Sequence, residues 1–285
     1  MPEIVKITEC PRDAMQGIKP FIPTEDKVRY LNALLRCGFD ILDFGSFVSP
    51  KAIPQMRDTA EVLSQLDLAD TETRLLAIIG NLRGAEDACK HPEISYLGFP
   101  FSISPTFLER NIKSTIEQSF DMVKQMLSLC QKHGKSLRVY ISMAFGNPYG
   151  DDWSAEILLH WIDQLHWAGV RHIVLADTTN EGEADTMGSV LQTIVPNYGE
   201  VEFGLHLHTK SSDWKQKIAA AYQAGCRHYD GVLHGLGGCP MAGPELVGNI
   251  RTTDLLYFFD NQQANTGIEW PRVEKARQIA EQILP

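Results

Sequence analysis

The chain has 285 residues, and 44% of them are hydrophobic, which is the composition of an ordinary water-soluble protein. Its mean hydropathy is −0.17, and it contains no apolar run long enough to cross a bilayer. The formal net charge of −10 and the absence of a Lys/Arg run exclude a general nucleic-acid-binding surface, because phosphate binding needs a basic footprint. An anionic small molecule stays compatible with this charge, since it needs only local positive groups.

The N-terminal residues are typical of a strand rather than of a basic segment followed by an apolar run. We therefore expect no signal or transit peptide and predict a cytoplasmic protein. The cysteines lie far apart without a CxxC pair, which favours reduced thiols. The six cysteines are Cys10, Cys37, Cys89, Cys130, Cys226 and Cys239.

Short β-branched and apolar runs recur along the chain, with amphipathic stretches between them. The predicted strands are Glu3–Glu9, Ile41–Ser46, Arg74–Ile79, Ile94–Phe101, Leu137–Met143, His172–Asp177, Val201–His208 and His228–His234. Eight parallel strands favour a closed (β/α)₈ TIM barrel. An open doubly wound sheet is the alternative, but no GxGxxG follows the first strand, where a dinucleotide site would need it.

Helices are predicted between these strands, and the clearest is Thr24–Cys37, with Thr24 as its N-cap and Gly38 as its stop. Further helices are predicted at Ser114–His133, Ser154–Ala168, Asp213–Ala224 and Thr252–Asp260. No low-complexity linker or composition shift divides the chain. We predict that residues 1–285 form a single catalytic domain.

Catalytic groups of a TIM barrel gather where the strands end at the carboxyl side, so we look there for reactive side chains. The first strand is expected to run into Arg12 and Asp13. Asp43 lies on the second strand and Asp177 ends the sixth, while His206 and His208 belong to the seventh.

His206 and His208 are two residues apart on a predicted strand, so their side chains point to the same face. They can share one ion, although an HxH pair alone is as often a pair of packed histidines. Asp13 supplies a third donor and favours the metal site. Imidazole combined with oxygen ligands suits Mg²⁺ or Mn²⁺, and the lack of a central thiolate weakens the case for zinc.

Arg12 and Cys239 are two further candidates at the barrel mouth. The Arg12 guanidinium suits a carboxylate or an enolate oxygen, but an ion pair at the barrel rim is equally compatible with the sequence. Cys239 lies in a glycine-rich loop after the eighth strand, where a thiol can donate or accept a proton. The other five cysteines are expected to serve packing.

Several segments resemble the 3-hydroxy-3-methylglutaryl-CoA lyase family, within the larger group of metal-dependent TIM-barrel aldolases and Claisen-type enzymes. The segments are PRDAMQ (Pro11–Gln16), SFVSPKAIPQM (Ser46–Met56), HLH (His206–His208), GLGGCP (Gly235–Pro240) and GN followed by TTDL (Gly248–Leu255). The GLGGCP loop is the most specific of them, and the resemblance covers nearly the whole chain.

The resemblance implies a divalent metal cation, Mg²⁺ or Mn²⁺, held by Asp13, His206, His208 and Asn249. It also implies substrate contact by Arg12, an active-site thiol at Cys239, and supporting catalytic roles for Asp43 and Asp177. The substrate it implies is an acyl-CoA thioester, and the assembly a homodimer. The implied reaction is a retro-Claisen cleavage of 3-hydroxy-3-methylglutaryl-CoA, or a close 3-hydroxyacyl-CoA, to acetyl-CoA and acetoacetate or the related keto acid.

The chain departs from the family pattern at four places. The family usually has Glu where this chain has Asp43, its pattern differs at residues 178–180 and 209–212, and it usually has an aromatic residue where this chain has Met241. One alternative is a Claisen-type synthase or keto-acid aldolase, which shares the Arg-Asp and HxH motifs but lacks the GLGGCP cysteine. A metal-dependent hydrolase would carry its HxH pair on the first strand. A metal-binding barrel that has lost catalysis is the third alternative.

Overall fold

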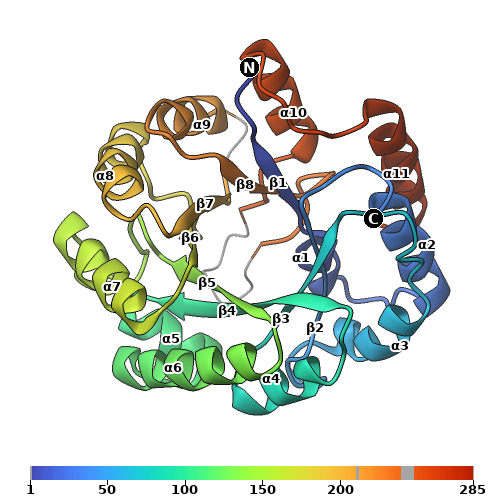
Figure 1. Ribbon diagram of the computed structural model, residues 1–285, viewed down its shortest axis with the longest axis horizontal. Helices are drawn as coiled ribbons and strands as arrows, with labels where there is room; N and C mark the ends of the chain where they lie inside the picture. The colour runs from blue at the N-terminus through green and yellow to red at the C-terminus, as the bar shows by residue number, and fades with distance from the viewer. Residues whose placement is uncertain (1, 210–211, 239–246, 285) are drawn as a thin grey trace.

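Eight parallel strands form one closed barrel, in which each strand pairs with the next along the chain and the last pairs with the first (Figure 1). The computed structural model describes residues 2–209, 212–238 and 247–284. The strands are β1 (Lys6–Glu9), β2 (Ile41–Ser46), β3 (Arg74–Ile78), β4 (Ile94–Ser102), β5 (Ser136–Ser142), β6 (His172–Asp177), β7 (Glu202–Leu207) and β8 (His228–Gly231). The predicted TIM barrel is confirmed.

Helices surround the barrel and cover the outer face of its strands (Figure 1). They are α1 (Pro11–Gln16), α2 (Thr24–Leu34), α3 (Thr59–Ser64), α4 (Leu82–Cys89), α5 (Pro105–Ile112), α6 (Ile116–Lys132), α7 (Ala155–Ala168), α8 (Ala184–Asn197), α9 (Trp214–Gln223), α10 (Thr252–Asn261) and α11 (Trp270–Ile283), with a short 3₁₀ turn at Pro54–Met56. Of these described helices, none has the length and apolar character that a membrane span requires.

The ends of the first and last strands differ from the prediction. β1 begins at Lys6 rather than Glu3, and Ile4 makes only an isolated bridge to Asn265. β8 ends at Gly231 rather than His234. Beyond that point the backbone turns, and Gly235 has a φ of +67°, which a strand cannot accommodate.

Asp13 was predicted at the end of a strand but lies in a helix. Pro11 occupies the first turn of α1, where its fixed φ and missing N–H suit a helix start. The helix begins directly after β1 and turns Arg12 and Asp13 toward the barrel mouth. The placement of Asp13 near the end of the first strand is confirmed, and the short helix α1 that carries it was not predicted.

The predicted N-cap of α2 is also wrong. Thr24 is the first residue of the helix rather than its cap, and its hydroxyl donates to the Asp58 carboxylate at 2.8 Å. The cap position belongs to Pro23. The expected stop is present, since Gly38 has a φ of +92° a few residues beyond the helix end.

A polar layer fills the barrel interior between strands that are distant in sequence. Arg138 of β5 donates to His228 at 3.1 Å and to the Asp230 carboxylate at 2.7 Å, both on β8. The His228 ring also contacts the Thr8 hydroxyl at 2.9 Å. Burial, together with the nearby Arg138 charge, lowers the pKa of His228, so the ring is neutral around pH 7. The Nη atoms of Arg138 are therefore paired, as a stable interior requires, whereas its buried Nε has no hydrogen-bond partner among the described residues.

Candidate active site

A pocket of about 240 Å³ opens at the carboxyl ends of the strands. One side of it carries polar residues that follow or belong to β1, β2 and β7, and the other side carries apolar residues around β3 and β4. The polar side includes Cys10, Arg12, Asp13, Gln16, Asp43, His206 and His208. The predicted cluster at the strand ends is therefore one site, with the exceptions described below.

Asp13, His206 and His208 form a set of donors that fits a divalent ion. Their nearest ligand atoms all lie within 4.8 Å of one another. The Nδ1 atom of His208 is buried and has no hydrogen-bond partner among the described residues. Burial, reinforced by the charge of His206, lowers the pKa of His208 to about 4, so this imidazole is neutral and able to act as a ligand at pH 7.

The Asp13 carboxylate is oriented from three directions. Its Oδ1 accepts from Arg12 at 3.2 Å and from the Gln16 side chain at 2.6 Å. Its Oδ2 accepts from the amide nitrogen of Asn249. Burial works against the charge on Asp13, but the Arg12 guanidinium and the two histidines outweigh it and lower the pKa. Asp13 is thus an ionised, pre-oriented oxygen donor.

Asn249 lies beside Asp13, in the loop that follows β8. Its amide nitrogen donates both to Asp13 and to the Leu236 carbonyl at 2.8 Å. In this orientation Asn249 holds the carboxylate, and the predicted direct ligation through its oxygen stays a prediction. Gly237 packs against the same pair, with a φ of +98° and a position at which a Cβ would lie 2.8 Å from the Asn249 amide. Only glycine fits this loop position.

Arg12 is held by the carboxylates of Asp43 and Asp13 and by the Gln16 side chain. Its Nη2 donates to Asp43 at 2.6 Å, and its Nε donates to the same carboxylate at 3.1 Å. Burial raises the pKa of Asp43 to about 6 even though Arg12 opposes the shift. The structure therefore shows the ion pair, and it also exposes Arg12 to the pocket, where a substrate oxygen can approach it.

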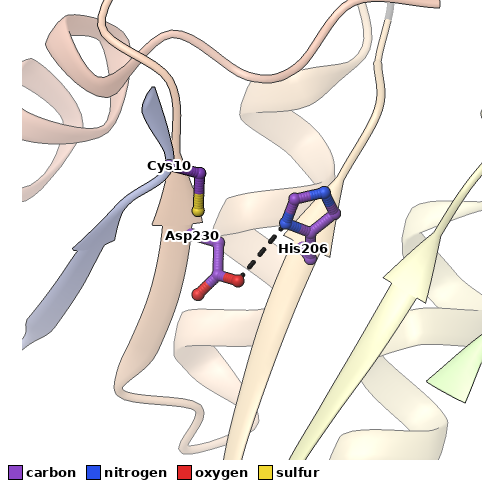
Figure 2. A group of neighbouring side chains, drawn as sticks. All are labelled: Cys10, His206 and Asp230. Atoms are coloured by element: carbon purple, nitrogen blue, oxygen red, sulfur yellow. Dashed lines mark hydrogen bonds and ion pairs between the residues drawn. The ribbon is translucent and has the colours of Figure 1, made fainter. Parts of the chain in front are cut away.

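Sequence reasoning missed Asp230, which forms a hydrogen bond with the ring of His206. Its Oδ2 lies 3.3 Å from His206 Nδ1 (Figure 2). Its other oxygen accepts from Arg138. Burial alone would lower the pKa of His206, but the hydrogen bond and charge of Asp230 raise it. The alternation His228–Tyr229–Asp230 places the first and third residues inside the barrel, and this period of two was the available signal.

Cys10 completes a second group of possible ligands with His206 and Asp230, whose donor atoms also lie within 4.8 Å of one another (Figure 2). The Asp230 carboxylate is already neutralised by Arg138, and burial raises the pKa of the Cys10 thiol well above its usual range. The set of Asp13, His206 and His208 instead offers the neutral imidazole of His208 and the ionised carboxylate of Asp13. Because these are the protonation states that bind a metal, this set is the better metal site of the two.

Asp177 ends β6 as predicted, but its side chain points away from the pocket. Its neighbours Ala176 and Thr178 line the pocket, and alternation along the strand sends Asp177 to the helix side. There it accepts from Lys217 of α9 at 2.8 Å and from the Glu181 backbone at 3.0 Å. The structure does not bring Asp177 together with the other site residues.

Cys239 lies outside the described residues, as do residues 210 and 211 of the altered segment after the histidine pair. The described part of the glycine-rich loop reaches Gly238, and Gly237 within it lies against the Asp13–Asn249 contact. The five other cysteines are buried and form no disulfide with one another. Cys37, Cys89, Cys130 and Cys226 pack in the core as predicted, whereas Cys10 also lines the pocket.

The barrel and its mouth define the class: a TIM-barrel enzyme with a buried His-His-carboxylate set and a pocket-facing arginine. Residues 3–280 match the HMGL-like family model, so the chain belongs to the HMGL-like family. Its members include carbon–carbon lyases, in agreement with the resemblance seen in the sequence.

Relatives match the chain along almost its whole length. It is 31% identical to the cytoplasmic 3-hydroxy-3-methylglutaryl-CoA lyase of Rattus norvegicus, over 97% of this chain and 80% of that protein. It is 30% identical to the hydroxymethylglutaryl-CoA lyase YngG of Bacillus subtilis, over 99% and 94%. An HMG-CoA lyase structure from Acinetobacter baumannii, in complex with coenzyme A and 3-methylmalate, superposes with a TM-score of 0.91 at 28% identity, covering 99% of this chain and 91% of that one.

Proposed function

We propose that the protein is a divalent-metal-dependent lyase that cleaves 3-hydroxy-3-methylglutaryl-CoA, or a close 3-hydroxyacyl-CoA, to acetyl-CoA and a keto acid. The observation that carries the proposal is the convergence of Asp13, His206 and His208 in one pocket with Arg12 beside them. Such a site suits a substrate with a hydroxyl, a carboxylate and a thioester. The relatives named above support the same chemistry.

A bound Mg²⁺ or Mn²⁺ would supply Lewis-acid chemistry that acidifies the substrate hydroxyl. Asp13, His206 and His208 would hold it, with Asn249 as the fourth ligand implied by the resemblance. Asp230 keeps the Nδ1 of His206 hydrogen-bonded, which leaves the Nε2 lone pair for the ion.

The remaining groups of the site can handle the proton and the developing charge. We propose that Asp43 Oδ1 accepts the hydroxyl proton, because a carboxylate with a pKa of about 6 is poised for proton transfer near pH 7. The C2–C3 bond then breaks, C3 becomes the ketone, and the electron pair forms the thioester enolate. Arg12 stabilises the enolate oxygen, and Cys239 donates a proton to C2 to give acetyl-CoA.

Asp177 fits a positioning role in this scheme. It ties the loop after β6 to α9 through Lys217, while Thr178 of the same loop lines the pocket. Asp177 would therefore fix the wall of the site without touching substrate.

The test is turnover by the purified protein. Incubation with 3-hydroxy-3-methylglutaryl-CoA and Mg²⁺ or Mn²⁺ is expected to release acetyl-CoA and acetoacetate in equal amounts, and a chelator is expected to abolish release. Asp13→Ala is expected to lose both bound metal and turnover. No turnover of this or related 3-hydroxyacyl-CoA thioesters would overturn the lyase assignment, and unchanged metal content in Asp13→Ala would overturn the metal site.

Two further expectations belong to the same proposal. Light scattering of the purified protein tests the homodimer. Fractionation of cells tests the cytoplasmic location. A monomer would contradict the homodimer, and a membrane-bound pool would contradict the cytoplasmic location. Neither result would affect the proposed chemistry.

A further inference from the structure

A chain of hydrogen bonds runs through the barrel interior, from its amino-terminal end to the proposed metal ligand His206. Glu202 is the first residue of β7 and His206 is the fifth, so the chain starts and finishes on one strand. His228 and Asp230 lie on the neighbouring strand β8, where Asp230 is in register with His206. Arg138 of β5, which is separated from β8 by two strands, reaches across the barrel and joins them.

Arg138 determines which nitrogen of His228 carries the proton. A guanidinium can only donate, so the Nε2 atom of His228, 3.1 Å from Arg138 Nη1, is the acceptor. Burial and the Arg138 charge lower the pKa of His228, so the ring is neutral and its single N–H lies at Nδ1. The Nδ1 atom lies 2.8 Å from Glu202 Oε1, which accepts from it. Glu202 therefore stabilises the one tautomer of His228 that can accept from Arg138.

The Arg138 guanidinium is fixed at two points. Nη1 is bound to His228, Nη2 donates to Asp230 Oδ1 at 2.7 Å, and the buried Nε has no hydrogen-bond partner among the described residues. Without the bond to His228, the guanidinium is free to turn about its remaining contact with Asp230. The Oδ2 atom of Asp230 lies 3.3 Å from His206 Nδ1 (Figure 2), so a carboxylate that turns with Arg138 no longer holds the His206 ring.

The interior of the barrel is shaped for this chain of bonds. Gly204 leaves the space that Arg138 occupies, since a Cβ there would lie 3.4 Å from Arg138 Nη2 and 3.3 Å from the His228 carbonyl oxygen. Arg138, His228 and Asp230 are each at most 2% exposed, so water does not compete for their hydrogen bonds. Glu202 is partly exposed at the amino-terminal end, where it lines a cavity together with His228.

This inference rests on the proposed function, because it concerns the ion that His206 is proposed to hold. We propose that Glu202 and His228 are positioning residues for that ion. They act through Arg138 and Asp230 to hold the ring of His206, whose Nε2 is left for the metal. Neither Glu202 nor His228 lines the active-site pocket. The amino-terminal end of the barrel, which ordinarily serves stability, thus contributes to metal affinity.

Glu202→Leu and Glu202→Gln separate the hydrogen bond from the charge. Leucine removes the acceptor for His228, whereas glutamine keeps a carbonyl oxygen at the same reach without the charge. Calorimetric titration of the full-length protein with Mn²⁺, after removal of bound metal by a chelator, measures the affinity. We expect Glu202→Leu to bind Mn²⁺ about 3–10-fold more weakly, which is less than the loss of a direct partner of a ligand, and Glu202→Gln to stay within about twofold of the parent protein. Equal affinity in all three proteins would overturn the inference.

Lys6→Met is the matched control. Lys6 pairs with the Glu202 carboxylate at the amino-terminal end of the barrel, so its removal disturbs Glu202 without removing the bond to His228. We expect this variant to match the parent protein in Mn²⁺ affinity. A loss equal to that of Glu202→Leu would show that the ion pair with Lys6, rather than the bond to His228, is responsible, and it would overturn the inference.

The ring nitrogens of His228 provide a measurement that needs neither metal nor a variant. Long-range ¹H–¹⁵N NMR spectra distinguish the two tautomers, and we expect the proton on Nδ1 in the parent protein and a mixture of tautomers in Glu202→Leu. A proton on Nε2 in the parent protein would overturn the inference even if Mn²⁺ binds. A parent protein that binds no Mn²⁺ would overturn both this inference and the proposed metal site. Binding of Mn²⁺ without cleavage of any thioester would overturn only the lyase assignment, because the affinity comparison does not depend on turnover.

Discussion

Two pairs of a carboxylate and a cation involve strands of the barrel and have different surroundings. Asp43 on β2 faces into the pocket and pairs with Arg12, which is itself open to the pocket. Asp177 on β6 faces the helix layer and pairs with Lys217, away from the pocket. Both carboxylates are buried. The face of the strand to which the side chain points separates a carboxylate that can meet substrate from one that holds the fold.

Asp177→Asn is the strongest test of this comparison. We expect a loss of about 3–5 kcal/mol in the free energy of unfolding, because Lys217 would be left buried without its counter-charge. Chemical denaturation measures the loss, and Asp185→Asn, at an exposed residue of α8, is the control. A variant of unchanged stability that has lost turnover would place Asp177 in the chemistry instead.

Arg12→Gln tests the inward-facing pair. We expect kcat to fall by about 10²–10³-fold, since one charged donor to the developing enolate is removed. Steady-state kinetics on the thioester substrate measure the effect, with exposed Arg29→Gln as the control. If kcat stays within twofold of the parent protein, Arg12 serves only as an ion pair.

Asp230→Asn tests the hydrogen bond between Asp230 and His206. We expect Mn²⁺ to bind about 10–100-fold more weakly, because the imidazole loses the partner that fixes its orientation. Calorimetric titration with Mn²⁺ gives the affinity, and exposed Asp121→Asn is expected to match the parent protein. Equal Mn²⁺ affinity in both variants would remove Asp230 from the metal site.

Glu9→Gln tests a second carboxyl that faces the helix layer. Burial raises the pKa of Glu9 to about 8, above its reference of 4.5, although bonds from Thr252 and Leu233 oppose the shift. The folded state therefore holds this proton more tightly, and the stabilisation present at low pH is lost as pH rises from about 4.5 to 8. The slope from this group is at most about 1.4 kcal/mol per pH unit.

Denaturation of both proteins at several pH values measures this effect. The parent protein is expected to lose stability from Glu9 as pH rises through that window, whereas Glu9→Gln has no proton to lose there and shows a flatter profile. Parallel profiles would mean that Glu9 is ionised in the folded protein.

The sequence predicts the fold and the position of a site residue correctly where they follow from local periodicity. The strand pattern predicts the barrel, and the spacing of His206 and His208 predicts that they share a face. Asn249 came from the family resemblance alone, because an Asn in a loop has no periodic signal. The direction of Asp177 was open to prediction, since Ala176 and Thr178 alternate with it, but its partner Lys217 is 40 residues away in the chain. Such long-range pairing is set by tertiary packing, which no local pattern reveals.

The proposed ligands come from distant parts of the chain, because Asp13 follows β1 whereas His206 lies on β7. In the closed strand order β8 lies between these two strands and pairs with both. The donor set is therefore complete only when the barrel is closed, so bound Mn²⁺ would report that the chain has joined its two ends through the β7–β8–β1 seam.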